Sequence, residues 1–210
     1  MTLRDYLDVS PVIPVLTIHR AEDGPPLARA LVAGGLRVLE VTLRTAAALE
    51  ALRRISHEVP EAIAAAGTVL CAQDLERAAA AGARFAFSPG LTEFMLEEGP
   101  VPILPGVATA SEVMKARDKG VTALKFFPAV PAGGVGALQA LAGPFPEMVF
   151  CPTGGIDQVN AASFLRLSNV LCVGGSWVAP EKKIADRDWA SITALARAAA
   201  DLAPPGGSNL

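Results

Sequence analysis

The sequence predicts an α/β fold, namely a single-domain (β/α)8 barrel of the TIM type. One unit recurs along the 210 residues: a short apolar or β-branched run, a capped helical pattern rich in Ala and Leu, and then a glycine. Eight such runs begin roughly 17 to 26 residues apart, which suits a strand, a helix and two short loops. The chain length also lies near the lower size limit of this barrel, about 200 residues.

The eight runs are the candidate strands of the barrel. Each run is short and is apolar or β-branched, which is typical of a strand. In chain order the candidate strands are Val12–Ile18, Arg37–Leu43, Ala62–Ala66, Arg84–Phe87, Val101–Leu104, Thr122–Phe126, Met148–Cys151 and Val170–Val173.

Signals for helix ends stand between these strands. Asp23 precedes a Pro–Pro pair, and Thr109 lies three residues before a glutamate in a capping-box pattern, so we expect helices to begin at both places. Two further candidate N-caps are Asp157 and Asp188. A glycine also follows three of the helical patterns just before the next strand, where a C′ glycine belongs: Gly35, Gly82 and Gly120.

An open, doubly wound sheet is the alternative arrangement of the same units. It is disfavoured because no G-x-G-x-x-G motif follows the first strand. No internal boundary is visible in the sequence, so we expect one domain over residues 1–202. The remaining residues, 203–210 (APPGGSNL), are expected to form a mobile tail.

The composition argues against several classes of protein. Hydrophobic residues make up 51% of the chain and charged residues 19%, so a large core is expected rather than disorder. With a net charge of −3 and no basic block, nucleic acid is not an expected partner. No apolar stretch approaches the roughly 20 residues that span a bilayer, so no membrane association is expected. The start, MTLRDYLDVS, lacks the apolar core of a signal peptide.

Cysteine and histidine usage bears on location and on metal binding. Cys71, Cys151 and Cys172 are odd in number and far apart, so we expect neither disulfides nor a CxxC metal site, and a cytoplasmic location. They are expected to be small core residues, since no histidine is placed to activate a thiol. With only two histidines, a zinc site of several histidines is not expected. His19, after the first strand, is a minor candidate for a substrate contact.

The second candidate strand carries the first group of polar side chains. In its sequence, RVLEVTLR, Glu40, Thr42 and Arg44 share one face because side chains alternate along a strand. Val41 and Leu43 share the other face. If that apolar pair packs against helices, Glu40 and Arg44 point into the barrel or its mouth, where the active residues of this fold lie. A structural Glu–Arg pair is the alternative.

Lys125 stands in the otherwise apolar run TALKFFPAV, although a buried, unpaired ammonium costs several kcal/mol. Leu124 and Phe126 are expected to face the helices, which leaves Lys125 pointing inward. One explanation is a Schiff-base lysine, because an amine attacks a carbonyl only when neutral and burial disfavours the ammonium form. The alternative is a lysine that snorkels to the rim of the barrel.

Two glycine pairs follow the last two candidate strands, in the sequences CPTGG and VGGS. TIM barrels frequently bind phosphate with the loops after strands seven and eight, and glycines there expose backbone N–H groups. Tight turns also use Gly–Gly, so each pair alone is a weak signal. Neither is a Walker A loop, because no G-K-S/T follows. The candidate phosphate ligands are Gly154, Gly155, Gly175 and Ser176.

Eight stretches of the chain together resemble one family of enzymes. In order they are PVIPVL, GGLRVLEVTLRT, AGTVL, FSPGLT, PGVATASE, ALKFFPA, FCPTGGI and LCVGGSW. They resemble the 2-keto-3-deoxy-6-phosphogluconate (KDPG) aldolases and their relatives that also cleave 2-keto-4-hydroxyglutarate (KHG). The resemblance runs from about Pro11 to Pro180. It implies a (β/α)8 barrel, usually a homotrimer, and a class I mechanism through a lysine imine, with no metal or other cofactor.

The resemblance implies cleavage of a keto-acid phosphate, KDPG, to pyruvate and glyceraldehyde 3-phosphate, or of KHG to pyruvate and glyoxylate. Lys125 in KFFP matches the Schiff-base lysine, and Glu40 in EVTLRT matches the general acid/base, which works partly through a water. Arg44 and Thr68 match groups that hold the pyruvate carboxylate. The remaining implied residues line the pocket (Pro89, Phe127 and Thr153) or bind phosphate (Gly154, Gly155, Gly175 and Ser176).

Two positions depart from the family pattern. Ala65 stands where many relatives have glycine, and Val130 where many have glutamate; either change could alter loop shape and substrate preference.

An aldolase for the C4-epimeric substrate, 2-keto-3-deoxy-6-phosphogalactonate, would use the same residues. A non-catalytic phosphate-binding barrel, or a phosphosugar isomerase or synthase, is the alternative on this scaffold. Lys125 favours the aldolase over a barrel that only binds phosphate, since phosphate binding alone needs no buried amine.

Overall fold

A computed structural model describes residues 1–202, and the predicted mobile tail lies outside the described residues. Each of the eight candidate strands overlaps a strand of the structure. The strands are β1 (Val12–Leu16), β2 (Val38–Thr42), β3 (Ile63–Gly67), β4 (Phe85–Phe87), β5 (Ile103–Leu104), β6 (Gly106–Val107), β7 (Ala123–Phe126), β8 (Val149–Pro152) and β9 (Val173–Gly175).

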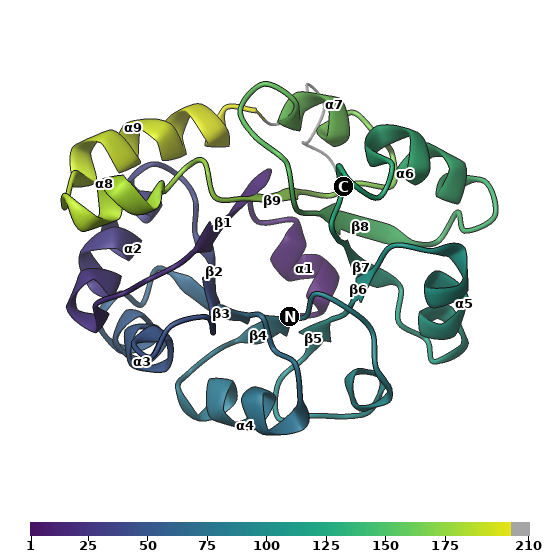
Figure 1. Cartoon of the computed structure of the whole chain (residues 1–210), viewed down its shortest axis with the longest axis horizontal. Helices are drawn as coiled ribbons and strands as arrows, with labels where there is room; N and C mark the ends of the chain where they lie inside the picture. Colours follow the sequence, from purple (N-terminus) through teal and green to yellow (C-terminus); the bar gives the residue numbers. More distant parts are fainter. Residues whose placement is uncertain (203–210) are drawn as a thin grey trace.

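Helices alternate with most of these strands and cover the outside of the sheet (Figure 1). The α-helices are α1 (Leu3–Leu7), α2 (Gly24–Ala33), α3 (Ala48–Glu58), α4 (Ala72–Ala80), α5 (Ala110–Asp118), α6 (Gly134–Ala142), α7 (Ala161–Leu165), α8 (Glu181–Ala185) and α9 (Trp189–Ala200). Two short 3-10 helices are η1 (Ala21–Asp23) and η2 (Glu93–Leu96). The helical unit expected after β4 is reduced to η2.

The sheet is parallel and curled. Six strands are hydrogen-bonded in the order β5-β4-β3-β2-β1-β9, and three in the order β6-β7-β8. β5 lies within the fifth predicted strand, whereas β6 lies beyond its predicted end; Pro105, which has no N–H to donate, separates the two. Two isolated bridges, Phe150–Val170 and Thr153–Gly174, link β8 to the segment of β9. The last strand therefore begins later than predicted, after a single bridge at Val170.

Side chains alternate between two apolar clusters, as the period of a strand requires. Leu124 and Phe126, like Val41, belong to the cluster between the strands and the helices. A second cluster, including Phe87, fills the space that the sheet curls around. The predicted alternation in β2 and β7 is confirmed, and it turns Glu40 and Lys125 away from the helices.

Helix α1, which the sequence analysis did not predict, packs at the amino ends of the strands. Its Leu7 is fully buried in the inner cluster. The ring of Tyr6 stacks on Phe85, the first residue of β4, with 4.6 Å between centroids. Because α1 occupies the amino ends, the carboxyl ends of the strands remain available for a site.

The predicted helix starts are partly confirmed. Thr109 forms the expected capping box at α5, and Asp188 accepts a hydrogen bond from the Ser191 backbone at the start of α9. Hydrogen bonds from Ser191 and Lys183 lower the pKa of Asp188 to about 2. The expected glycines Gly35, Gly82 and Gly120 all have positive φ, the conformation that follows a helix end.

The helix start predicted at Asp23 is confirmed, since Asp23 is the N-cap residue of α2, but the cap predicted at Asp157 is wrong. Asp23 precedes α2, but its buried carboxylate accepts hydrogen bonds from Arg20 and Arg187 instead of from the helix backbone. Two cations outside the helix are stronger partners for a buried carboxylate than neutral N–H groups. Asn160, not Asp157, precedes α7, and Asp157 accepts backbone hydrogen bonds in the turn before it.

The cysteines divide between the interior and the surface. Cys151 and Cys172 are fully buried in the inner cluster, and burial raises the pKa of the Cys172 thiol. Cys71 is exposed, so its predicted place in the core is wrong. It holds the N-cap position of α4, where the chain leaves the sheet for the surface.

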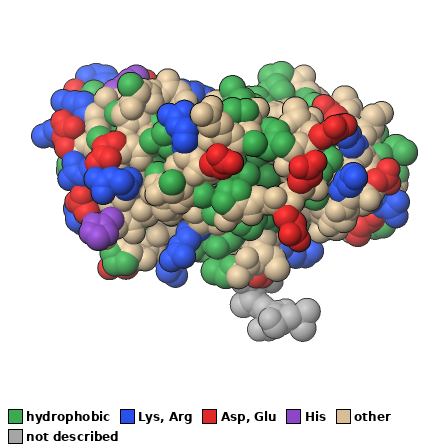
Figure 2. Space-filling model, turned by 90° about the horizontal axis from the view of Figure 1, so that it is seen from below, with side chains coloured by type: hydrophobic (Ala, Val, Ile, Leu, Met, Phe, Trp, Pro, Cys, Tyr) green, Lys and Arg blue, Asp and Glu red, His purple; other side chains and the backbone are tan. Residues whose placement is uncertain are grey.

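The surface that Figure 2 shows has positive and negative side chains interspersed, with apolar atoms between them. The longest described helix, α9, has 12 residues. No helix within residues 1–202 is long and apolar enough to cross a membrane.

Candidate active site

A buried ion pair between β2 and β7 is the centre of the candidate site. Lys125 Nζ donates to Glu40 Oε1 at 2.9 Å and to Oε2 at 3.2 Å. Only 4% of Lys125 and 1% of Glu40 is exposed. The lysine therefore does not snorkel to the rim, and the glutamate pairs with Lys125 rather than with Arg44. Neither charge is left without a partner.

Two aromatic rings surround the ammonium group. Lys125 Nζ lies 5.1 Å from the centroid of Phe87, at the end of β4, and 5.5 Å from that of Phe127, directly after β7. Ring faces attract a cation at such distances and also exclude water. The ion-pair partner of this amine within residues 1–202 is Glu40.

A glycine on the neighbouring strand makes room for the Glu40 side chain. Gly67 ends β3, in register with Thr42 on β2. A Cβ atom on Gly67 would lie 2.6 Å from Glu40 Cγ, a distance that real Cβ atoms essentially never show. Ala65, one of the two departures from the family pattern, pairs with Glu40 in the same register and is fully buried in the inner cluster. Its methyl group is accommodated without disturbing the ladder.

The residue directly after β3, Thr68, lies beside Arg44 and has an unusual backbone conformation. Thr68 has φ of 61°, a left-handed conformation that is strained for a β-branched residue. Its Oγ1 accepts a hydrogen bond from Arg44 Nε at 3.1 Å. Arg44 has no ion-pair partner among residues 1–202. Its terminal N–H groups are available to bind an anion.

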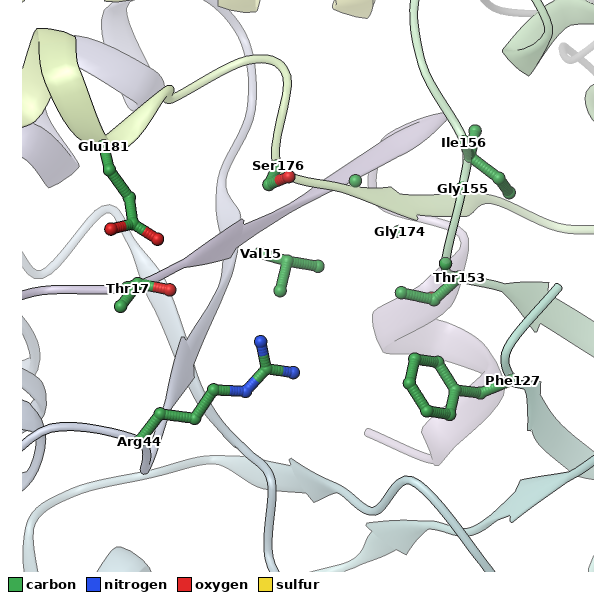
Figure 3. Close-up of a pocket in the computed structure, with 12 residues that line it drawn as sticks. Val15, Thr17, Arg44, Phe127, Thr153, Gly155, Ile156, Gly174, Ser176 and Glu181 are labelled. Carbon is green, nitrogen blue, oxygen red and sulfur yellow. The ribbon is translucent and has the colours of Figure 1, made fainter. Parts of the chain in front are cut away.

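A pocket of about 200 Å³ opens at the carboxyl ends of β1, β2, β7, β8 and β9. Arg44 extends into this pocket from one side, and Phe127 and Thr153 line the opposite side (Figure 3). The ring of Phe127 lies between the pocket and the buried Lys125. The predicted site residues that line the pocket are Arg44, Phe127, Thr153, Gly154, Gly155, Gly175 and Ser176.

The glycine pair after β8 turns in a conformation that favours glycine. Gly154 and Gly155 have φ of 103° and 76°. Backbone hydrogen bonds from Ala129 to Thr153 and from Val130 to Gly154 tie this loop to the loop after β7. Val130, the second departure from the family pattern, packs against Gly155, where an added Cβ would lie 2.8 Å from Val130 Cβ. The apolar side chain therefore supports the turn.

The glycine pair after β9 has a packing role as well. A Cβ on Gly175 would overlap the ring of Trp177, and one on Gly174 would overlap the side chain of Thr153. Ser176 follows directly, is exposed, and lies at the edge of the pocket. The absence of side chains on the pair thus leaves space for Trp177 and Thr153 beside the predicted anion site.

Five predicted residues do not line the pocket itself: Lys125 and Glu40, which form the buried pair, Thr68, which contacts Arg44, and also Pro89 and His19. Pro89 follows β4, and its backbone packs closely against Gly106. His19 points to Glu181, with 3.3 Å between Nε2 and Oε2. The sequence analysis missed Thr17 and Glu181, which do line the pocket. The period of β1 could have found Thr17, because it shares a face with inward-pointing Ile13, whereas no pattern marked Glu181.

A parallel sheet with a buried lysine–carboxylate pair and an anion-accepting pocket at its carboxyl ends defines an α/β enzyme. The model of the family described as KDPG and KHG aldolase matches residues 3–195, and the chain belongs to this family.

Close relatives agree with this assignment. The chain is 54% identical to the 2-dehydro-3-deoxy-phosphogluconate aldolase of Dickeya dadantii, over 92% of each chain. It is 52% identical to the KHG/KDPG aldolase of Escherichia coli strain K12, over 93% of each. Its structure is similar to that of KDPG aldolase from Legionella pneumophila, with a TM-score of 0.93 and 46% identity, covering 95% of this chain and 98% of that one. In that crystal structure pyruvate is captured at low pH as a covalent carbinolamine intermediate.

The space beside Glu40 yields a stability prediction. Gly67→Ala introduces a Cβ that Glu40 must move to avoid, so we expect a loss of about 1–3 kcal/mol in the free energy of unfolding. Chemical denaturation measures this loss. Gly90→Ala is the control, since a Cβ there meets nothing within 4 Å. Equal stability of the two variants would contradict the tight packing of Glu40 against β3.

Proposed function

We propose that this protein is a class I aldolase that cleaves KDPG to pyruvate and glyceraldehyde 3-phosphate. The observation that carries the proposal is the buried pair of Lys125 and Glu40 beside an open, anion-accepting pocket. Family membership and relatives that bear this name over nine-tenths of the chain support it. The relative named KHG/KDPG aldolase favours KHG as a second substrate.

The proposed reaction begins with a proton transfer within the ion pair. Lys125 must lose a proton to become a nucleophile, and Glu40 Oε1 accepts it across the 2.9 Å contact. The neutral amine then attacks the C2 ketone of the substrate and forms a carbinolamine. The protonated Glu40 returns its proton to the departing hydroxyl group, so water leaves and a protonated imine forms.

Carbon–carbon cleavage uses the same two residues. The iminium on Lys125 is an electron sink, so the C3–C4 bond breaks when Glu40, directly or through a water, removes the proton of the C4 hydroxyl. Glyceraldehyde 3-phosphate leaves, and an enamine remains on Lys125. Glu40 then protonates C3, and water hydrolyses the imine to release pyruvate and the free lysine. Every proton that Glu40 accepts is returned within the cycle, and the route needs no metal ion.

Arg44 and Thr68 are proposed to orient the pyruvate end. Thr68 holds Nε of Arg44, which leaves the terminal nitrogens for a bidentate contact with the substrate carboxylate. This contact fixes the ketone relative to Lys125, and such orientation contributes to rate by reducing the entropy lost in the attack. Phe127 and Thr153 would line the middle of the bound substrate.

The phosphate end is proposed to lie on the loops after β8 and β9. Gly154, Gly155 and Gly175 present backbone N–H groups, and Ser176 offers a hydroxyl. The left-handed backbone of Gly154 and Gly155 supports this role, because such turns aim successive N–H groups at one point. Pro89, away from the pocket, is proposed to act only by packing against Gly106.

We also propose that the curled sheet is a closed (β/α)8 barrel and that residues 1–202 form one domain. The bridges between β8 and the β9 segment support closure on one side. Closure also explains why Lys125 and Glu40, on strands far apart in the sequence, meet across the interior.

Trapping with pyruvate and borohydride tests the imine. We expect intact and peptide mass spectrometry to find a reduced pyruvate adduct on Lys125 alone. Lys125→Ala should give no adduct, and Lys119→Ala, which removes an exposed lysine, should label like the wild type. No adduct from folded wild-type protein with pyruvate in excess would refute the class I mechanism.

Glu40→Gln separates imine formation from turnover. The amide preserves the shape of the side chain but cannot act as a base, so we expect kcat to fall by roughly 10²–10⁴-fold. Borohydride should still trap pyruvate on Lys125 in this variant, but more slowly, because imine formation then lacks Glu40 as its proton acceptor and donor. Steady-state cleavage of KDPG gives the measurement, and circular dichroism verifies the fold. Unimpaired turnover would eliminate Glu40 as the acid/base.

Ser176→Ala tests the phosphate end. A hydrogen bond to a charged group contributes about 1.5–3 kcal/mol, so KM for KDPG should rise roughly tenfold or more. Cleavage of the unphosphorylated analogue serves as the internal control and should be unaffected. An equal loss on both substrates would contradict a phosphate contact.

A further inference from the structure

A carboxylate stands at the wall of the pocket that is proposed to receive phosphate. Glu181 begins α8 and lines the same pocket as Ser176 and Arg44. Figure 3 shows its carboxylate near Thr17, on the side of the pocket away from Phe127. A negative charge here is unexpected, because the glycine loops and Arg44 otherwise favour anions.

Little in the structure neutralises this charge. The ion-pair partner of Glu181 within residues 1–202 is His19, at 3.3 Å, and about two-thirds of each side chain is exposed. Arg44 also lines the pocket but lies outside ion-pair distance of Glu181. Thr17, the other neighbour in view, carries no charge. Glu181 is therefore a solvent-facing carboxylate that a substrate entering the pocket must approach.

Two arginines anchor the end of the helix that Glu181 begins. Arg20, in the loop after β1, donates to the backbone of Ala185 at the end of α8. Arg187, just after α8, donates to the buried carboxylate of Asp23 at 2.9 Å. These contacts hold the short helix against the β1 loop, and its first residue, Glu181, lies at the wall of the pocket.

Repulsion by Glu181 depends on the charge at the far end of the substrate. A phosphate dianion carries about twice the charge of the carboxylate of KHG, and the unphosphorylated analogue of KDPG carries none there. Coulomb energies scale with the product of charges, so the three substrates would be disfavoured in that order. Because Glu181 is exposed, added salt would weaken the effect.

We propose that Glu181 is a specificity-determining residue that weakens the preference of this pocket for phosphorylated substrates. The inference rests on the proposed aldolase function and concerns its substrate range. The carboxylate of Glu181 opposes the attraction that the anion-binding loops exert on the far end of the substrate. Substrates whose far end is uncharged or singly charged therefore remain competitive with KDPG.

Glu181→Gln removes the charge and preserves the shape. We expect kcat/KM to rise about threefold to tenfold for KDPG, to rise less for KHG, and to stay unchanged for the unphosphorylated analogue. The gain for KDPG should shrink at high salt. Glu181→Asp, which keeps the charge, should resemble the wild type. Glu61→Gln is the matched control, an exposed glutamate before β3 at the opposite end of the sheet.

Two results would overturn the inference. One is an equal change for all three substrates, and the other is no change for KDPG. Calorimetric binding of inorganic phosphate supplies a readout that does not depend on turnover, and we expect tighter binding to Glu181→Gln than to the wild type. A wild-type protein that neither cleaves KDPG nor traps pyruvate would refute the proposed function, whereas unaltered phosphate affinity would refute the role of Glu181.

Discussion

The contact between Lys125 and Glu40 is the interaction on which the interior of this protein depends. Removing either charge from water costs several kcal/mol, and the pair is tolerated because each group satisfies the other at 2.9 Å. The surrounding strands are arranged to permit this contact. Gly67 leaves the space that the Glu40 side chain fills, and the rings of Phe87 and Phe127 flank the ammonium.

The two ends of the sheet differ in role: the amino ends close the core, and the carboxyl ends hold the candidate site. At the amino ends, α1 closes the inner cluster with Leu7 and the stacked ring of Tyr6. At the carboxyl ends, the backbone is shaped by polar and conformational requirements, including the left-handed Thr68 and the two glycines after β8. Strain is tolerated where a rigid sheet holds the flanking residues in place. The proposed chemistry therefore sits on fixed strands, with a pocket built from loops above them.

The pocket combines features that attract and repel anions. Arg44 favours the carboxylate at one end of the substrate, and the glycine loops favour the phosphate at the other end. Glu181 opposes the binding of the phosphate. In the proposed function, Lys125 and Glu40 determine the reaction and the pocket wall determines which substrates reach it. Ala65 and Val130 differ from the family pattern, yet one fits the ladder beside Glu40 and the other packs on Gly155. Neither disturbs the ion pair.

The sequence alone determined the eight strands and the inward direction of Glu40 and Lys125, because alternation along a strand is a local property. The start of α5 and the glycines after three helices were predictable for the same reason. Only the tertiary structure decided that Lys125 pairs with Glu40 rather than remaining at the rim, since 85 residues separate them in the chain. The tertiary structure also paired the carboxylate of Asp23 with two arginines rather than with the helix backbone, and it placed Glu181 at the pocket. Such partners are chosen by packing between distant segments, which no local pattern encodes.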